Sequence, residues 1–173
     1  MTREDKLIRQ IQNGSRECLD ELVAMYYPAI LRYCMWHTPD VESAKDAAQD
    51  TFLKLVRFID RYDHRGQFKA FLYRIAANAC TDILRGAQTT ETLSEQITDL
   101  FFGQDTGYQA VEDRQQLKAA FICLDESQRE LILLRYGQEL TLKEISALTG
   151  LPLRTVQTRL RRALARMRHA LDT

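Results

Sequence analysis

The stretch from Leu151 to Arg162, LPLRTVQTRLRR, holds four arginines within twelve residues of a chain whose net charge is zero. Gln157 and Thr158 stand among these arginines. A helix in the major groove of DNA can bind guanine through Arg, adenine through Gln, and a base edge or thymine methyl group through Thr. The residue types therefore predict binding of duplex DNA. The predicted contact residues are Arg154, Gln157, Thr158, Arg159, Arg161 and Arg162.

Two helices joined by a tight turn are needed to place this stretch in a groove, and the sequence predicts both. Thr141 and Glu144 have the T-x-x-E spacing of a capping box, which satisfies free N–H groups at a helix start. Gly150 is suited to end that helix, and Pro152 is suited to open the next one. The spacing predicts a short helix, a tight turn and a long helix, the order of a helix-turn-helix.

The long helix is predicted to bury one face and to expose its basic residues. Its apolar face is formed by Val156, Leu160, Ala163, Leu164, Met167 and Leu171. The alternative is an ordinary bundle helix with a solvated basic face. The capped helix and the glycine turn in front of it favour DNA binding over that alternative.

The chain of 173 residues is predicted to be helical, because it has only seven glycines and three prolines and its apolar residues recur mainly at spacings of three and four. Charge divides it into three segments. Residues 1–86 carry 13 Lys/Arg and 12 Asp/Glu, residues 87–113 carry no Lys/Arg and 6 Asp/Glu, and residues 114–173 carry 11 and 6. We therefore expect an all-α fold in which two small helical domains, 1–86 and 114–173, are joined by an acidic flexible linker, 87–113.

The sequence carries no signature of a catalytic, cofactor or metal site. Its four cysteines form no C-x-x-C pair, its three histidines are scattered, and it has no Walker-type glycine loop, H-E-x-x-H or G-x-S-x-G. We expect free and mostly buried thiols, no cofactor, no small-molecule substrate and no enzymatic activity. No apolar run reaches the length of a membrane span, and the N-terminus is charged, so the expected location is the cytoplasm.

The N-terminal half offers two further binding surfaces. A helix over residues 41–59 is predicted to bury Ala44, Ala48, Phe52, Leu55, Val56 and Ile59. Its opposite face carries Asp46, Gln49, Asp50, Leu53 and Arg57. An exposed leucine beside two acids and a glutamine suits a partner protein, although single exposed leucines are common. The loop RYDHRGQ, residues 61–67, combines basic and aromatic side chains and therefore suits single-stranded nucleic acid.

Three motifs, in this order along the chain, resemble regions of bacterial sigma factors. They are DAAQDTFLKLVRF, FKAFLYRIAANACTDILR and LTLKEISALTGLPLRTVQTRLRRALARMR, which look like regions 2.2, 2.3 to 2.4, and 4.2. The chain has no room for a separate middle domain, so it is similar to the extracytoplasmic-function group, also called group IV.

The resemblance implies a role for each surface. The residues that match the contacts with the polymerase β′ clamp helices are Asp46, Gln49, Asp50 and Leu53, with Asp50 standing where the family usually has Glu. The residues that match those binding the −10 element of the promoter are Tyr62, His64, Arg65, Lys69, Arg74 and Asn78. The loop from Tyr62 to Gln67 matches the one that captures a base flipped out of the DNA strand. The arginine-rich helix matches the helix that binds the −35 element of the promoter. In this family that helix belongs to a module that docks on the flap of the polymerase β subunit.

The implied partners are core RNA polymerase, promoter DNA and an anti-sigma factor, which in this family is often membrane-anchored. Two alternatives remain. A two-domain helix-turn-helix regulator would bind its operator without polymerase, often as a dimer. A helical enzyme would need a cluster of acid, base or metal-ligating side chains, for which the sequence has no suitable spacing.

Overall fold

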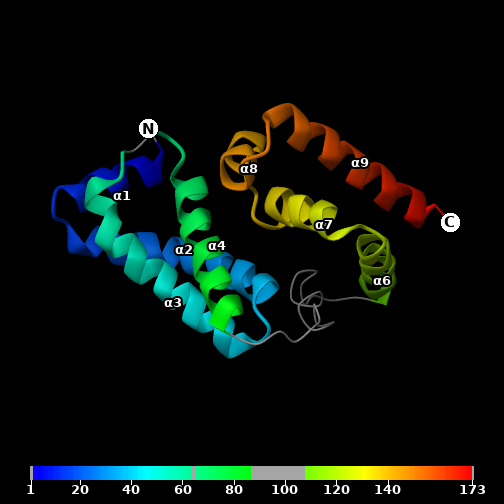
Figure 1. The fold of residues 1–173 in the computed structure, drawn as a ribbon, viewed down its shortest axis with the longest axis horizontal. Coiled ribbons are helices and arrows are strands. Elements are labelled where there is room, and N and C mark those ends of the chain that lie inside the picture. Colours follow the sequence, from blue (N-terminus) through cyan, green and yellow to red (C-terminus); the bar gives the residue numbers. More distant parts are fainter. Residues whose placement is uncertain (1, 64, 87–107, 173) are drawn as a thin grey trace. The chain divides into compact units, whose positions relative to one another are not determined.

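The computed structural model describes residues 2–63, 65–86 and 108–172, and all regular structure within those residues is helical (Figure 1). The chain divides into two compact units, Met1–Leu93 and Ser94–Thr173. The expected all-α fold with two small domains is therefore confirmed. Most of the predicted linker, residues 87–107, lies outside the described residues, and the following segment is helical from Tyr108 onward.

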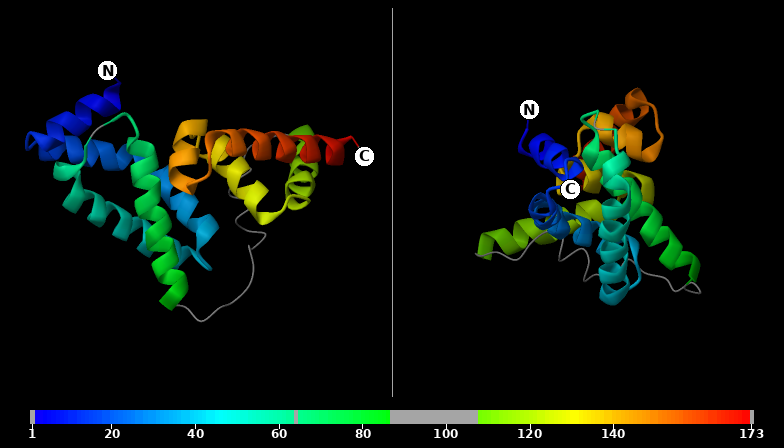
Figure 2. Two further views of the ribbon diagram at one scale, coloured as in Figure 1. Left: turned by 45° about the horizontal axis from the view of Figure 1, so that its top comes forward. Right: turned by 90° about the vertical axis from the view of Figure 1, so that its left-hand side faces the viewer.

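The described residues of the first unit form a bundle of four helices: α1 (Arg3–Gln12), α2 (Arg16–His37), α3 (Val41–Phe58) and α4 (Phe68–Gly86), with a short 3-10 turn, η1 (Ile59–Arg61), after α3. Helix α2 packs against α1, α3 and α4, and α3 packs against α4. Figure 2 shows α3 and α4 crossing within this unit. The largest fully buried side chains of the unit include Tyr73, Phe68 and Leu22, which lie on α4 and α2.

Helix α3 begins and ends close to the predicted residues. The Asp40 carboxylate accepts a hydrogen bond from the Ser43 amide and so caps its start. The helix buries Ala44, Ala48, Phe52 and Leu55 as predicted, and Ile59 is buried just beyond its end. The prediction was wrong for Val56, which is 45% exposed. Val56 follows the buried Leu55 by one residue, and a rotation of about 100° per residue carries it past the edge of the buried face.

The second unit contains α6 (Tyr108–Ile122), α7 (Glu126–Ile132), α8 (Leu142–Thr149) and α9 (Leu153–Leu171). Helix α9 packs against each of the other three (Figure 1). Their shared core contains Phe121, Leu131, Leu140, Ile145 and Val156. The apolar face predicted for α9 is buried along most of its length, but the prediction was wrong for Leu164 and Leu171, which are 37% and 43% exposed at its outer edge and free end.

The predicted helix-turn-helix is formed by α8 and α9. The Thr141 side chain accepts from the Glu144 amide, and the Glu144 carboxylate accepts from the Thr141 amide at 2.7 Å, so the predicted capping box is confirmed. Gly150 ends α8 in the left-handed region, with φ of 72°. The Ser146 hydroxyl donates to the Leu151 carbonyl at 2.6 Å and fixes the turn that leads into α9.

Replacing Gly150 with alanine should destabilise the second unit by about 1 kcal/mol, because a β-carbon disfavours the left-handed backbone. No atom lies within 4 Å of where that β-carbon would stand, so the cost comes from the backbone alone. Gly86 has equally open space and no positive φ, which makes Gly86→Ala the matched control. Urea unfolding followed by circular dichroism should show the loss for Gly150→Ala only; equal effects at the two glycines would contradict this explanation.

One feature of the second unit has no counterpart in the sequence prediction. After α7 the backbone widens into a π-helical turn, η2 (Leu133–Gly137), in which the Gln138 amide donates to the Leu133 carbonyl at 2.9 Å. The Arg135 guanidinium donates to the Leu140 carbonyl at 3.0 Å and holds the far side of the turn. The turn leads into Glu139, which adopts a positive φ of 54°. It connects α7 to the helix-turn-helix.

Candidate nucleic-acid interface

The polar residues of α9 stand on the outside of the second unit. Val156, Leu160, Ala163 and Met167 are buried, and this orientation fixes which side chains face solvent. The exposed predicted contacts are Arg154, Gln157, Arg159, Arg161 and Arg162, and Thr158 is half-buried. The Thr158 hydroxyl donates to the Arg154 carbonyl at 2.9 Å, one turn earlier.

The arginines of α9 differ in their partners. Within the described residues, the guanidinium groups of Arg154, Arg161 and Arg162 form no ion pair. Arg159 instead donates to the Ser127 hydroxyl at 3.3 Å, near the start of α7. Arg166, one turn from Arg162 and absent from the predicted set, donates to Gln128 at 3.0 Å and lies 3.8 Å from the Asp125 carboxylate. Of the predicted contacts, Arg154, Arg161 and Arg162 are therefore the arginines most available to an anionic ligand.

The loop between η1 and α4 forms an aromatic pocket in the first unit. The rings of Tyr62 and Phe71 stack with centroids 4.6 Å apart, and Tyr62 meets Phe68 edge to face. A pocket of about 160 Å³ opens beside this stack and is lined by Tyr62, Asp63, Arg65, Gln67, Ala70, Phe71 and Arg74. Burial raises the pKa of Tyr62, so its hydroxyl stays protonated at neutral pH. His64, predicted as a contact of this loop, lies outside the described residues.

The loop is held in place by helix α1, which packs against η1. Gln12, at the end of α1, donates to the carbonyls of Ile59 and Tyr62 at 3.0 and 2.7 Å. Arg65 pairs with Asp63 at 2.6 Å within the loop. No sequence pattern signalled the role of Gln12, because the two segments are far apart along the chain and meet only through tertiary packing.

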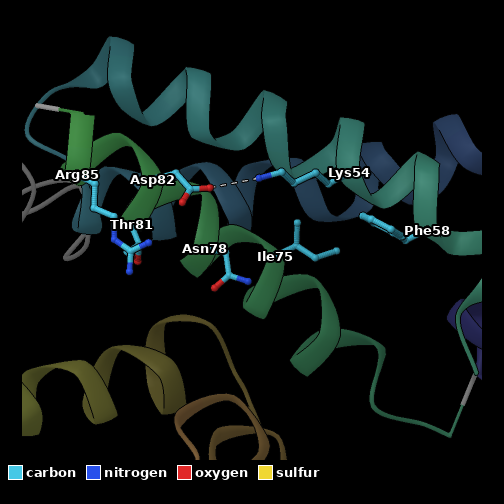
Figure 3. Close-up of a pocket in the computed structure, with 7 residues that line it drawn as sticks. All are labelled: Lys54, Phe58, Ile75, Asn78, Thr81, Asp82 and Arg85. Carbon is cyan, nitrogen blue, oxygen red and sulfur yellow. Dashed lines mark ion pairs between the residues drawn. The ribbon is translucent and has the colours of Figure 1, made fainter.

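A second pocket, of about 410 Å³, lies between α3 and α4 (Figure 3). Its lining residues are Lys54, Phe58, Ile75, Asn78, Thr81, Asp82 and Arg85, and we call it the α3–α4 groove. Of the predicted −10 contacts, Asn78 lines this groove and Arg74 lines the aromatic pocket. Lys69, half-buried at the start of α4, lines neither. The structure thus places Tyr62, Arg65 and Arg74 at the aromatic pocket and Asn78 at the α3–α4 groove.

The face of α3 that was predicted to bind a protein partner is open to solvent. Asp46 and Gln49 are exposed, Asp50 is half-buried, and Leu53 is 53% exposed. The Asp50 carboxylate lies 2.7 Å from the Lys54 ammonium one turn later. A hydrogen bond from Lys54 to Asp50 raises the pKa of the Lys54 amine. Lys54 was not among the predicted residues, although its i,i+4 spacing from Asp50 was a usable signal.

Comparison with known proteins supplies the family. Residues 22–90 match the family model for sigma-70 region 2, and residues 114–167 match that for sigma-70 region 4. The RNA polymerase sigma factor YlaC of Bacillus subtilis is 30% identical over 153 residues, which cover 86% of this chain and 88% of that protein. The chain belongs to the extracytoplasmic-function group of the sigma-70 family. The resemblance inferred from the three motifs is confirmed.

Other similar proteins agree with the extracytoplasmic-function (ECF) assignment. The ECF RNA polymerase sigma factor SigW of Bacillus subtilis is 27% identical, with 96% of this chain and 95% of that protein covered. The sigma factor RpoE of Bartonella quintana, solved in complex with the anti-sigma factor NepR, has the same fold with a TM-score of 0.65. It is 21% identical, over 89% of this chain and 96% of that one. This ECF sigma factor is thus a polymerase-associated protein that acts on promoter DNA.

None of the four cysteines, all within the described residues, forms a disulfide, as predicted, but only Cys34 and Cys80 are buried, while Cys18 is half-buried and Cys123 is exposed. A hydrogen bond with Cys80, together with burial, raises the pKa of Cys34 and disfavours its thiolate. Over the described ranges, His, Cys, Asp and Glu side chains form no group of three that could hold a metal ion. None of the helices described is both long and apolar enough to be a membrane span.

Proposed function

We propose that this ECF sigma factor docks on the β′ clamp helices through Asp46, Gln49, Asp50 and Leu53, reads the −35 duplex with α9, and reads the −10 element with α4 and its preceding loop. The observation that carries the proposal is the exposed face of α9. There Arg154, Arg161 and Arg162 have no carboxylate partner in the described structure, on the second helix of a capped helix-turn-helix. The −35 contacts proposed on this face are Arg154, Gln157, Thr158, Arg159, Arg161 and Arg162.

Promoter opening follows from capture of a base that leaves the stack. Extruding a base costs a few kcal/mol, and the cost is least when the base is already unpaired. The aromatic pocket beside Tyr62 and Phe71 combines a stacking surface with the cations Arg65 and Arg74, which suits one base and its phosphate. The −10 contacts proposed are Tyr62, His64, Arg65, Lys69, Arg74 and Asn78. Opening then requires no nucleotide hydrolysis by this chain, which acts as a binding subunit and not as an enzyme.

Specificity is expected to arise in the holoenzyme. The second domain carries a net charge of +5 from 11 Lys/Arg and 6 Asp/Glu, and the first only +1 from 13 and 12. Two weakly basic units give weak, salt-sensitive DNA binding when free. Polymerase fixes the distance between the two units, so that both elements are read together. The proposed location is accordingly the cytoplasm, where polymerase and promoter DNA are found.

An anti-sigma factor is the proposed regulator. The Bartonella relative was solved in complex with one. In this chain the α3 face offers Leu53, which is 53% exposed, beside the acidic residues of the proposed polymerase contact. A protein that covers this face would exclude polymerase. In this family such regulators are often membrane-anchored, which would connect transcription to a signal from outside the cell.

Run-off transcription tests the proposed function. Purified core polymerase is incubated with fragmented genomic DNA of the source organism, with and without the protein, and transcript starts are sequenced. We expect a small set of starts that require the protein and share −35 and −10 sequences. Identical starts with and without the protein would overturn the proposal. A pull-down with core polymerase tests docking independently of the promoter.

Replacing Arg74 with alanine should weaken the binding of a single-stranded −10 oligonucleotide by the holoenzyme. Loss of one phosphate contact should also reduce the slope of log affinity against log salt by about 0.7. Arg32, an exposed arginine of α2 that lines neither pocket, supplies the control variant Arg32→Ala. Fluorescence anisotropy at several salt concentrations measures both quantities. An unchanged slope for Arg74→Ala would exclude a phosphate contact.

A further inference from the structure

Lys54 stands between the proposed polymerase contact and the α3–α4 groove. Its ammonium lies 2.7 Å from the Asp50 carboxylate on α3 and 3.6 Å from the Asp82 carboxylate on α4. Figure 3 shows Lys54 and Asp82 reaching toward each other from the two helices. Asp50 belongs to the α3 face, and Asp82 lines the groove together with Asn78. One cation is therefore shared by acids that belong to two different surfaces.

The two pairs are unequal. A separation of 2.7 Å is a short hydrogen bond, whereas 3.6 Å is too long for one. In the free protein Lys54 therefore hydrogen-bonds to Asp50 and forms only a longer ion pair with Asp82, so the negative charge of Asp82 beside the groove is offset in part. A lysine ammonium is a compact charge with three donors on a flexible stem, so it can change partners without backbone movement. The side chains of Asp50 and Asp82 are 46% and 62% exposed, so both carboxylates are open to other ligands.

We propose that Lys54 is a positioning residue that couples polymerase docking to DNA binding, an inference that rests on the proposed function. A cation of polymerase that pairs with Asp50 competes with Lys54 for the same carboxylate and repels its charge. Lys54 then turns to Asp82 and neutralises it. A negative charge that would repel a DNA phosphate is thereby removed from the groove at the moment of docking. In the free protein Lys54 is shared with Asp50 and offsets the Asp82 charge only in part, so the free protein binds promoter DNA less well than the holoenzyme does.

Four holoenzymes test this coupling through Lys54: wild type, Lys54→Met, Asp82→Asn and the double variant. Each is assembled at saturating core polymerase, and its affinity for the non-template −10 strand of a promoter mapped by run-off transcription is measured by anisotropy. Lys54→Met should lower the affinity about threefold, the usual size of a partly exposed charge interaction. The same substitution in the Asp82→Asn protein should have no effect, because no charge is left to neutralise. Lys54→Arg should restore wild-type affinity.

The control for Lys54→Met is Lys45→Met. Lys45 also forms an α3 ion pair, with Glu42 at 2.9 Å, and it does not line the groove. It should leave the affinity unchanged.

Two results would overturn the proposed role of Lys54. If Lys54→Met lowers the affinity equally in the wild-type protein and in the Asp82→Asn protein, the lysine binds DNA directly. If it leaves the affinity at the wild-type value, Lys54 has no role in DNA binding. Failure of the proposed function would look different, because the wild-type holoenzyme would then bind the −10 strand no better than core polymerase alone.

Discussion

Core polymerase should bind the Asp50→Arg protein at least about 100-fold more weakly than wild type, corresponding to about 3 kcal/mol, because a charge at the centre of an interface is reversed. Asp50 lies on the exposed face of α3 beside Leu53, within the proposed β′ clamp contact. The substitution also places a second cation one turn from Lys54, in place of the present 2.7 Å pair. Anisotropy of labelled protein titrated with core polymerase measures the affinity, and run-off transcription should fail in parallel.

The control for this prediction is Asp20→Arg, which makes the same charge change at an exposed position of α2. Its affinity for core polymerase should stay close to wild type. Circular dichroism establishes that both variants remain folded. Wild-type affinity for Asp50→Arg, or an equal loss for Asp20→Arg, would show that the α3 face is not the docking site.

Transcription from promoters with a matching −35 element should fall about 5- to 150-fold in the Arg161→Ala holoenzyme, because a bidentate contact with a base contributes about 1–3 kcal/mol of discrimination. Arg161 is exposed on α9 and forms no ion pair in the part of the chain that the structure describes. Loss of a base contact has a second consequence. Promoters altered at the one base pair that Arg161 contacts should be transcribed as well by the variant as by the wild type.

A panel of promoters, each changed at one position of the −35 element, distinguishes base contact from phosphate contact. A base contact gives lost discrimination at one position, and a phosphate contact gives a uniform decrease over the whole panel. The control is Arg168→Ala, which removes an exposed α9 arginine near the far end of the helix. It should leave the panel unchanged. A uniform decrease for Arg161→Ala would assign that residue to the DNA backbone.

The sequence predicted those features that depend on local pattern. The capping box of Thr141 and Glu144, the left-handed Gly150 and the buried face of α9 around Val156 and Leu160 follow from residue type and helical spacing, and all were confirmed. The order of the three motifs also predicted the family. Where the pattern was extended to the edge of a buried face, as at Val56 and Leu164, it was wrong, because neighbouring helices decide how wide that face is.

Features that depend on tertiary packing could not be predicted. The π-helical turn before α8 requires the Leu133 carbonyl to accept from Gln138, five residues later, and no residue in the segment signals that spacing. The α3–α4 groove requires Lys54 and Asp82, which are far apart in the sequence, to lie on facing helices. Arg159 was predicted only as a DNA contact, and its hydrogen bond to Ser127 became visible only in the packed unit.

Specific promoter binding should require this chain and core polymerase together, and neither should bind specifically alone. Footprinting of one mapped promoter tests this requirement. Nuclease protection and permanganate reactivity are measured with the protein alone, with core polymerase alone and with both. We predict protection of both elements, and reactive thymines near −10, only when both are present. Protection by the protein alone, at half-sites about one helical turn apart, would contradict the sigma-factor mechanism and indicate a free-standing regulator.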